Sequence, residues 1–217
     1  MTPLARDLLA ATLARVPFDG WTWSTVEAAA QDTGETPATA RRIFPHGLRD
    51  TLSFFLAEAD RRMLEELAER DLGSMPIRQR IATAIRVRLE QAAPHREAIR
   101  RALALQMTPA YASAVPGDVA RTVDAMWRAA GDTATDFNHY TKRALLAGVY
   151  GATLLHWLDD DTPDNAATWA FLERRIGDVM RIQKARGRLD LIAAKLTAPI
   201  EAALARRGQK AARDWQA

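Results

Sequence analysis

The side chains that most often carry out chemistry are few in this chain and widely separated. Its 217 residues include no cysteine and four histidines, His46, His95, His139 and His156. The lack of cysteine excludes a disulfide scaffold, a zinc–thiolate site, an iron–sulfur cluster and a thiol nucleophile. A di-iron helical bundle needs two Glu-x-x-His repeats with further glutamates, whereas the one acid placed three residues before a histidine is Asp136, before His139. We therefore predict a protein that is not an enzyme.

Other patterns that mark catalytic or metal sites are also missing. The sequence contains no Gly-x-Gly-x-x-Gly, no Gly-x-x-x-x-Gly-Lys and no Gly-x-Ser-x-Gly. The acidic run Asp159–Asp161 lacks the spaced ligands of a calcium loop, so we expect it to be a solvated connection between helices. The sequence predicts no metal and no cofactor.

Charge is distributed unevenly along the chain. Residues 1–70 carry 8 Lys or Arg against 11 Asp or Glu, and residues 71–180 carry 13 of each. Residues 181–217 carry 9 basic and 3 acidic residues, so the excess positive charge lies in the last segment. A basic segment of this kind suits an anionic partner such as a membrane surface.

No run of residues approaches the roughly 18–20 apolar residues that a membrane-spanning helix needs. The stretch Met1–Gly20 also lacks the basic lead and apolar run of a signal peptide. We expect a bacterial cytoplasmic protein, peripheral on the inner membrane, or a mature form that has already been processed.

Apolar residues recur at helical spacing along nearly the whole chain, and sustained strand-like alternation is absent. The series Ile77, Ile81, Ile85 and Leu89 is an example. Breaks at glycine, proline and capping residues predict helices over 24–32, 36–44, 48–70, 137–158, 166–184 and 189–206, with a further one opening at Pro94. The pattern predicts an all-α fold of about nine to ten helices.

Two short predicted helices precede the first long one. Ser24 and Glu27 fit a capping box, Gly34 suits a helix end, and Thr36 with Pro37 suits a new start. This order resembles the N-terminal half of TetR-type regulators, in which a Phe-Pro step leads to a long linking helix.

DNA binding is nevertheless not our preferred interpretation of this part of the chain. A DNA reader needs a basic surface, whereas residues 1–70 have more acidic than basic residues. Arg41 and Arg42 are the only adjacent basic pair in the expected recognition helix. We expect a degenerate helix-turn-helix over residues 1–47 that serves as scaffold and binds no nucleic acid.

Three phrases in the chain are unusual in composition. The first, Val16–Trp23, reads VPFDGWTW and is expected to pack the first helices together. The second runs from Trp127 through Gly131–Arg143, which reads GDTATDFNHYTKR, to Tyr150, and the third is Thr168–Ile176. In this order, from about Pro17 to Arg181, they resemble the ubiquinone-biosynthesis lipid-binding accessory family, the Coq-nine family.

The resemblance implies a TetR-like fold adapted to hold lipid. The family binds isoprenoid quinone precursors and phospholipid, forms homodimers, and presents substrate to the demethoxyubiquinone hydroxylase. The matching partner surface is Asp136, Phe137, His139 and Tyr140, where His139 departs from an aromatic residue of the family. Arg143 matches a family position associated with a lipid head group.

The residues of the predicted helix 137–158 agree with a ligand-binding role without requiring it. A helix that is apolar nearly all round is either buried or faces a ligand cavity. Lys142 and Arg143 lie unfavourably at the positive end of the helix dipole, which an anionic head group would explain, as would Asp132 or Asp136. The expected lipid-binding residues are Lys142, Arg143, Leu146, Val149, Tyr150 and Leu154.

The last segment has the pattern of a helix that lies on anionic lipid. Apolar residues form one stripe and basic residues flank it, although Pro199 would kink or split the helix. The expected membrane-binding residues are Leu189, Ile192, Lys195, Leu196, Ile200, Leu204, Arg206 and Arg207. A helix packed on the body with a solvated charged face is the other interpretation.

We therefore expect a TetR-like helical lipid-binding domain over residues 1–184 and a basic amphipathic membrane-binding helix and tail over residues 185–217. The predicted function is a non-catalytic accessory protein that holds isoprenoid lipid, docks on a membrane and hands quinone precursor to the hydroxylase. The alternative is a TetR-type DNA-binding repressor with a lipid effector.

Overall fold

Every regular element in the described part of the chain is helical. The computed structural model describes residues 2–132 and 137–181, without the side chains of residues 137–139. The α-helices are α1 (Pro3–Asp19), α2 (Trp23–Asp32), α3 (Pro37–Ile43), α4 (Leu48–Ala68), α5 (Ile77–Ala92), α6 (Arg96–Gln106), α7 (Pro109–Ala112), α8 (Val115–Ala129) and α9 (Phe137–Leu158). Two 3₁₀ turns, η1 (Ala93–His95) and η2 (Pro163–Asn165), and a final helix over 166–181 complete the described elements. The predicted all-α class is confirmed.

The chain divides into two units, Met1–Glu173 and Arg174–Ala217. The nine numbered helices lie in the first unit, and helix 166–181 begins in it. No described helix is long and apolar enough to cross a membrane. The predicted boundary between residues 184 and 185 lies outside the described residues.

Helices α2 and α3 each begin after a threonine whose hydroxyl oxygen accepts a hydrogen bond from a backbone amide of the first turn. Thr36 caps α3 as predicted, because its hydroxyl oxygen accepts a hydrogen bond from the Thr39 amide. The prediction of Ser24 as the cap of α2 is wrong, since Thr22 accepts from the Thr25 amide and the helix begins at Trp23. Gly34 has a φ of +77°, which favours glycine after a helix end.

Trp21 ties the first helices to the rest of the unit. Its indole Nε1 donates to the Ala98 carbonyl on α6 at 2.8 Å, and its ring centroid lies 5.7 Å from that of Phe55 on α4. Phe18, from the same aromatic phrase, is 85% exposed. The phrase therefore packs through Val16 and Trp21, and Trp21 reaches beyond the first helices to α4 and α6.

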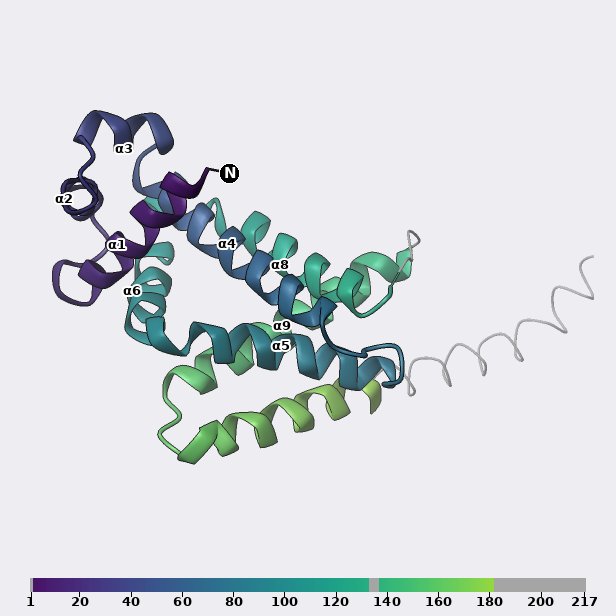
Figure 1. Ribbon diagram of the computed structural model, residues 1–217. Helices are drawn as coiled ribbons and strands as arrows, with labels where there is room; N and C mark the ends of the chain where they lie inside the picture. Colours follow the sequence, from purple (N-terminus) through teal and green to yellow (C-terminus); the bar gives the residue numbers. More distant parts are fainter. Residues whose placement is uncertain (1, 133–136, 182–217) are drawn as a thin grey trace, which may run out of the picture. The chain divides into compact units, whose positions relative to one another are not determined.

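Four long helices make the core of the first unit. Helix α4 packs on α5 and α8, and α9 packs on α8 and α5 (Figure 1). Apolar side chains from each helix are fully buried here, including Met63, Ile85, Met126 and Trp157. Helix α9 is not buried all round, because Ala144, Gly148 and Leu155 on one stripe are exposed.

The connection between α9 and the next helix is organised by Asp160. This side chain accepts hydrogen bonds from the backbone amides and hydroxyls of Thr162 and Thr168, at 2.6–2.9 Å. Asp160 is 5% exposed, so the expectation of a wholly solvated acidic loop is wrong at this residue. Arg100 holds the same turn by donating to the Leu158 carbonyl and pairing with Asp159.

Candidate functional site

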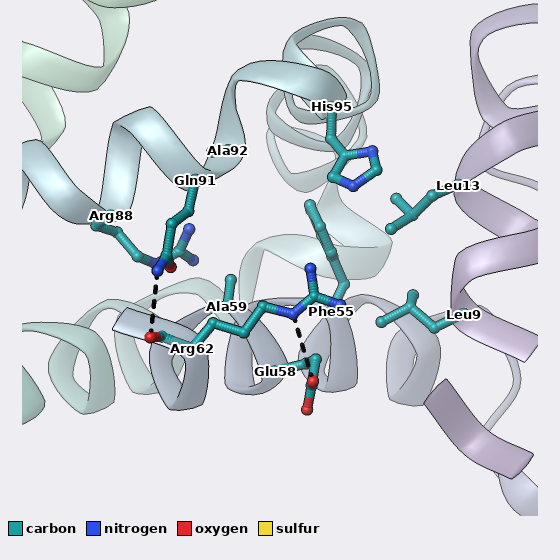
Figure 2. A pocket seen from close by; sticks show the side chains of 10 residues that line it. All are labelled: Leu9, Leu13, Phe55, Glu58, Ala59, Arg62, Arg88, Gln91, Ala92 and His95. Carbon is teal, nitrogen blue, oxygen red and sulfur yellow. Dashed lines mark hydrogen bonds and ion pairs between the residues drawn. The ribbon is translucent and has the colours of Figure 1, made fainter. Parts of the chain in front are cut away.

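Two adjoining cavities lie among the helices of the first unit. The first, here the Gln91 chamber, has a volume of about 30 Å³ and is lined from α1, α4, α5 and η1 (Figure 2). The second, here the Tyr150 chamber, has a volume of about 40 Å³ and is lined from α4, α5, α6 and α9. Phe55, Arg88 and Ala92 line both chambers and therefore separate them.

The two chambers differ in polarity. The Gln91 chamber is lined by Leu9, Leu13, Phe55, Glu58, Ala59, Arg62, Arg88, Gln91, Ala92 and His95. The Tyr150 chamber is lined by Phe55, Leu56, Arg88, Leu89, Ala92, Ile99, Ala102, Leu103, Gln106, Tyr150 and Leu154. Half of the first set is polar or charged, whereas the second is mainly aliphatic. Together they offer a polar end and an apolar end.

Arg88 is the charged residue at the junction of the chambers, and Asp60 on α4 compensates its charge. Arg88 Nε lies 3.2 Å from Asp60 Oδ1, and the Thr122 hydroxyl on α8 donates to both Asp60 oxygens at 2.9 and 3.0 Å. Burial raises the pKa of Asp60, and the nearby Arg88 cation opposes that rise. This network joins α4, α5 and α8 behind the cavities.

Burial and nearby cations shift the pKa values of the titratable groups that line the chambers. Burial, with a smaller contribution from the Arg62 cation, lowers the pKa of His95. Burial raises the pKa of the Tyr150 hydroxyl, so it keeps its proton at neutral pH. Hydrogen bonds from Arg61 lower the pKa of Glu58, which is therefore ionised. The chambers thus present a neutral imidazole and a phenol.

The structure brings two of the predicted lipid-binding residues to these cavities. Tyr150 and Leu154 line the Tyr150 chamber. Leu146 and Val149 are buried but line neither chamber. Leu146 and Val149 thus pack within the core.

Lys142 and Arg143 lie in a cluster of charges at the start of α9, in which Arg128 also pairs with Asp124. Lys142 Nζ lies 2.8 Å from Asp132 Oδ1, and Arg143 Nη2 lies 2.6 Å from Asp124 Oδ1. Arg143 also reaches Asp132 Oδ2 at 3.5 Å. Sequence analysis offered two explanations for these cations, and the ion pairs favour acidic side chains: Asp124 lies on α8 and Asp132 follows that helix.

The predicted partner surface is described in part. Asp136 lies outside the described residues, and Phe137 and His139 belong to the first turn of α9 without described side chains. Tyr140 is 73% exposed. All the predicted membrane-binding residues, from Leu189 to Arg207, lie outside the described residues as well.

The helix-turn-helix is formed by α2 and α3. One of its two adjacent arginines, Arg41, contacts an aromatic ring within the unit. The Arg41 guanidinium carbon lies 3.9 Å from the centroid of the Trp23 ring, a cation–π contact. The Trp23 indole in turn donates to Glu27 at 2.5 Å. Arg42 lines a groove of about 590 Å³ with residues of α1, α4 and α8.

Sequence analysis did not single out Arg88, Gln91 or Phe55. The sequence nevertheless contains a pattern that could have identified Arg88, because this residue lies between Ile85 and Leu89 on the apolar face of α5. An arginine on such a face needs a buried acid or a cavity. Among the described residues no group of three or more His, Cys, Asp or Glu could hold a metal ion.

The chain is similar to proteins of known families. The family model described as COQ9 matches residues 112–183. The human ubiquinone biosynthesis protein COQ9, mitochondrial, is 34% identical over 186 residues, which cover 82% of this chain and 58% of that protein. The fruit-fly protein of the same name is 31% identical over 180 residues, covering 81% of this chain and 55% of its own length. The chain thus spans somewhat more than half the length of these relatives.

A solved structure shows the fold. The TetR transcriptional regulator from Nitrosomonas europaea superimposes with a TM-score of 0.67 at 18% identity, covering 81% of this chain and 97% of that chain. The predicted TetR-like fold is confirmed, and at this identity the likeness concerns the fold alone.

The relatives correct one expectation and confirm another. The predicted location, a bacterial cytoplasm with peripheral attachment to the inner membrane, is wrong by this comparison, because the curated relatives are named mitochondrial. The family resemblance is confirmed: over 82% of its length this chain is similar to the COQ9 ubiquinone-biosynthesis proteins, on a TetR-like fold.

Proposed function

We propose that this protein is a non-catalytic accessory protein of ubiquinone biosynthesis that binds an isoprenoid quinone precursor. The observation that carries the proposal is the similarity to COQ9 proteins, which are named for ubiquinone biosynthesis, over 82% of the chain. In this role the protein acts by binding and presenting a substrate, and a partner, the demethoxyubiquinone hydroxylase, performs the chemistry.

The two chambers support the binding part of the proposal. They lie between α1, α4, α5, α6 and α9, with apolar residues at one end and polar residues at the other. Volumes of about 30 and 40 Å³ hold only a few water molecules, so an isoprenoid tail enters only if lining side chains move apart. Phe55 is the side chain whose movement joins the chambers.

Delivery of a lipid substrate requires contact with a membrane and with the hydroxylase. We propose that the basic segment 185–217 binds anionic membrane through its apolar stripe, and that phospholipid is a second ligand. The proposed surface for the hydroxylase is Asp136, Phe137, His139 and Tyr140 at the start of α9. The exposure of Tyr140 suits this role.

The proposal includes a homodimer formed through α9. Ala144, Gly148 and Leu155 are exposed and fall on one stripe of this helix. Small residues on such a stripe allow close approach of a second helix, and the larger apolar side chain of Leu155 would be covered by it.

Flotation with vesicles that contain anionic phospholipid tests the membrane and lipid claims together. The full chain should float, whereas a chain truncated after Gln183 should not, and mass spectrometry should find an isoprenoid quinone or precursor in the purified full chain. Replacing Lys195, Arg206 and Arg207 by Gln in the full chain is the matched variant, because it keeps the length and removes three cations. If the full chain neither floats nor carries isoprenoid lipid, the proposed function is wrong.

A further inference from the structure

Three polar groups around the chambers lack a hydrogen-bond partner in the described part of the chain. Gln91 Oε1 is buried and unpaired. Arg88 is 3% exposed and donates through Nε to Asp60, while its two terminal nitrogens donate to no described residue. The Tyr150 hydroxyl likewise makes no hydrogen bond with the described residues, although its side chain is buried.

The orientation of the Gln91 amide follows from its neighbours. Its Nε2 donates to the Arg62 carbonyl at 3.2 Å and to Glu66 Oε2 at 2.6 Å, and both of these partners are acceptors. The amide nitrogen must therefore face α4, which leaves Oε1 as a buried acceptor in need of a donor. In Figure 2, Gln91 and Arg88 extend from α5 toward α4 on the same side.

A ligand group that satisfies this chamber must both donate and accept. Gln91 Oε1 is buried and requires a donor, and the terminal nitrogens of Arg88, whose Nε donates to Asp60, can donate to an acceptor. A hydroxyl group on a ring meets both requirements with one or two oxygens. Water also meets them, and a volume of about 30 Å³ is enough to hold it.

We propose that the Gln91 chamber receives the oxygenated ring of an isoprenoid quinol, with a ring hydroxyl donating to Gln91 Oε1 and a ring oxygen accepting from Arg88. This inference rests on the proposed function, because it names the head-group site of the lipid that the protein binds. The tail then extends along the more apolar Tyr150 chamber, between Leu103 and Leu154.

Charge favours an uncharged ring over a phosphate in this chamber. The charge of Arg88 is already compensated by Asp60 at 3.2 Å, and Glu58 in the chamber lining pairs with Arg6, Arg61 and Arg62, so the cations at the chamber already have carboxylate partners. A phosphate dianion offers acceptors only, so it cannot donate to Gln91 Oε1. A neutral quinol instead pairs with Gln91 and leaves the compensation of Arg88 intact.

Phe55 must move for the ring and tail to be bound together. Its side chain lies between the chambers, packs against Trp21 and meets the His95 ring edge-on at 6.5 Å. Replacing Phe55 with Leu removes the flat barrier but keeps an apolar side chain. This variant should accelerate binding of a tailed probe.

The test uses the full chain and two probes with the same tail. One is a farnesyl-substituted hydroquinone, and the other is farnesylbenzene, which has the ring and tail without oxygen. Titration calorimetry should give tighter binding of the hydroquinone by about tenfold or more, since the analogue leaves buried polar groups unpaired. Gln91→Met and Arg88→Lys should each reduce this preference to about threefold or less, with little effect on farnesylbenzene.

The variants are chosen to keep the fold. Arg88→Lys retains the charge opposite Asp60, and Gln79→Met, on the exposed face of the same helix, is the matched control that should keep the full preference. If the wild-type protein binds both probes equally, or if Gln91→Met keeps the preference, the head-group site is wrong and the proposed function stands. If neither probe binds the wild-type protein, the proposed function itself fails.

Discussion

Asp60 on α4 and Arg88 on α5 form an ion pair inside the first unit, with 3.2 Å between Oδ1 and Nε and exposed side-chain fractions of 6% and 4%. Taking two charges out of water is costly, and the attraction between them repays that cost only when hydrogen bonds satisfy both groups. The single hydroxyl hydrogen of Thr122 is shared between the two oxygens of Asp60, at 3.0 and 2.9 Å. The pair therefore specifies how α4, α5 and α8 pack and holds Arg88 at the cavities.

Removing one member of this pair should be far more damaging than removing both. Arg88→Met leaves Asp60 buried without its main partner, which should lower the free energy of unfolding by about 3–5 kcal/mol at pH 7. The double variant Asp60→Leu with Arg88→Met should lie within about 1 kcal/mol of wild type. Urea denaturation of the four proteins measures the coupling directly.

The destabilisation caused by Arg88→Met should depend on pH, and the direction follows from the pKa of Asp60. Burial raises the pKa of Asp60, so folding favours its protonated form, and the penalty of an unpaired Asp60 is largest at high pH. The defect of Arg88→Met should shrink as the pH falls through the pKa of Asp60. A double variant destabilised by the sum of the two single effects would show that the pair is not coupled.

The helix-turn-helix should not bind DNA in a sequence-specific manner. Residues 1–70 carry three more acidic than basic residues, and Arg41 is stacked on Trp23. Too few cations are then available to neutralise phosphates. Fluorescence anisotropy with a mixed set of labelled duplexes, at about 50 and 200 mM salt, should show weak binding with a shallow salt dependence. Tight binding that collapses with salt, and that Arg42→Ala weakens, would favour the repressor alternative.

Local sequence patterns predicted the helices well. The predicted long helices 48–70 and 137–158 correspond to α4 (Leu48–Ala68) and α9 (Phe137–Leu158). These boundaries depend on glycine, proline and helical apolar periodicity, all of which act within a few residues along the chain. The cap of α2 was assigned to Ser24 instead of Thr22, because two hydroxyl residues stand close together and local spacing cannot rank them.

Features that depend on distant residues were not predictable in this way. The partner of Arg88 is Asp60, 28 residues earlier, and the partner of Trp21 is the Ala98 carbonyl, 77 residues later. The sequence predicted that all three acids of Asp159–Asp161 are solvated, yet Asp160 accepts hydrogen bonds from Thr162 and Thr168. The apolar pattern of helix 137–158 led to Tyr150 and Leu154, whereas the polar half of the candidate site emerged only from the packing of α5 against α4.

A charge placed on the exposed stripe of α9 should separate the proposed dimer. A side chain at Gly148 would meet no other atom within 4 Å, so Gly148→Arg is accommodated in the monomer. The substitution also raises helix propensity by roughly 0.5–1 kcal/mol. Sedimentation velocity should show a wild-type dimer and a Gly148→Arg monomer with unchanged circular dichroism.

The matched control for this substitution is Ala120→Arg, on an exposed position of α8. It adds the same charge and should leave the dimer intact. A dimer that survives Gly148→Arg places the interface elsewhere, and a wild-type protein that stays monomeric at every concentration contradicts the homodimer prediction.

Asp160→Asn should destabilise the protein at neutral pH and lose its effect in acid. An asparagine keeps one acceptor oxygen, but its amide nitrogen meets a donor at Thr162 or Thr168, both of which donate from backbone and hydroxyl. Hydrogen bonds to a charged group contribute about 1.5–3 kcal/mol each, so a loss of about 2 kcal/mol is expected at pH 7.

The pH dependence follows from the pKa of Asp160. Burial opposes its charge, yet the hydrogen bonds from Thr162 and Thr168 together outweigh burial and lower the pKa below the ordinary value of 3.8. The stabilisation is therefore present above that ordinary value and is lost as the pH falls below it. Urea denaturation at pH 7 and in acid should show the gap between wild type and Asp160→Asn narrowing in acid. Asp161→Asn, at an exposed neighbour, should change stability little at either pH, and an equal effect of both substitutions would mean that Asp160 does not organise the turn.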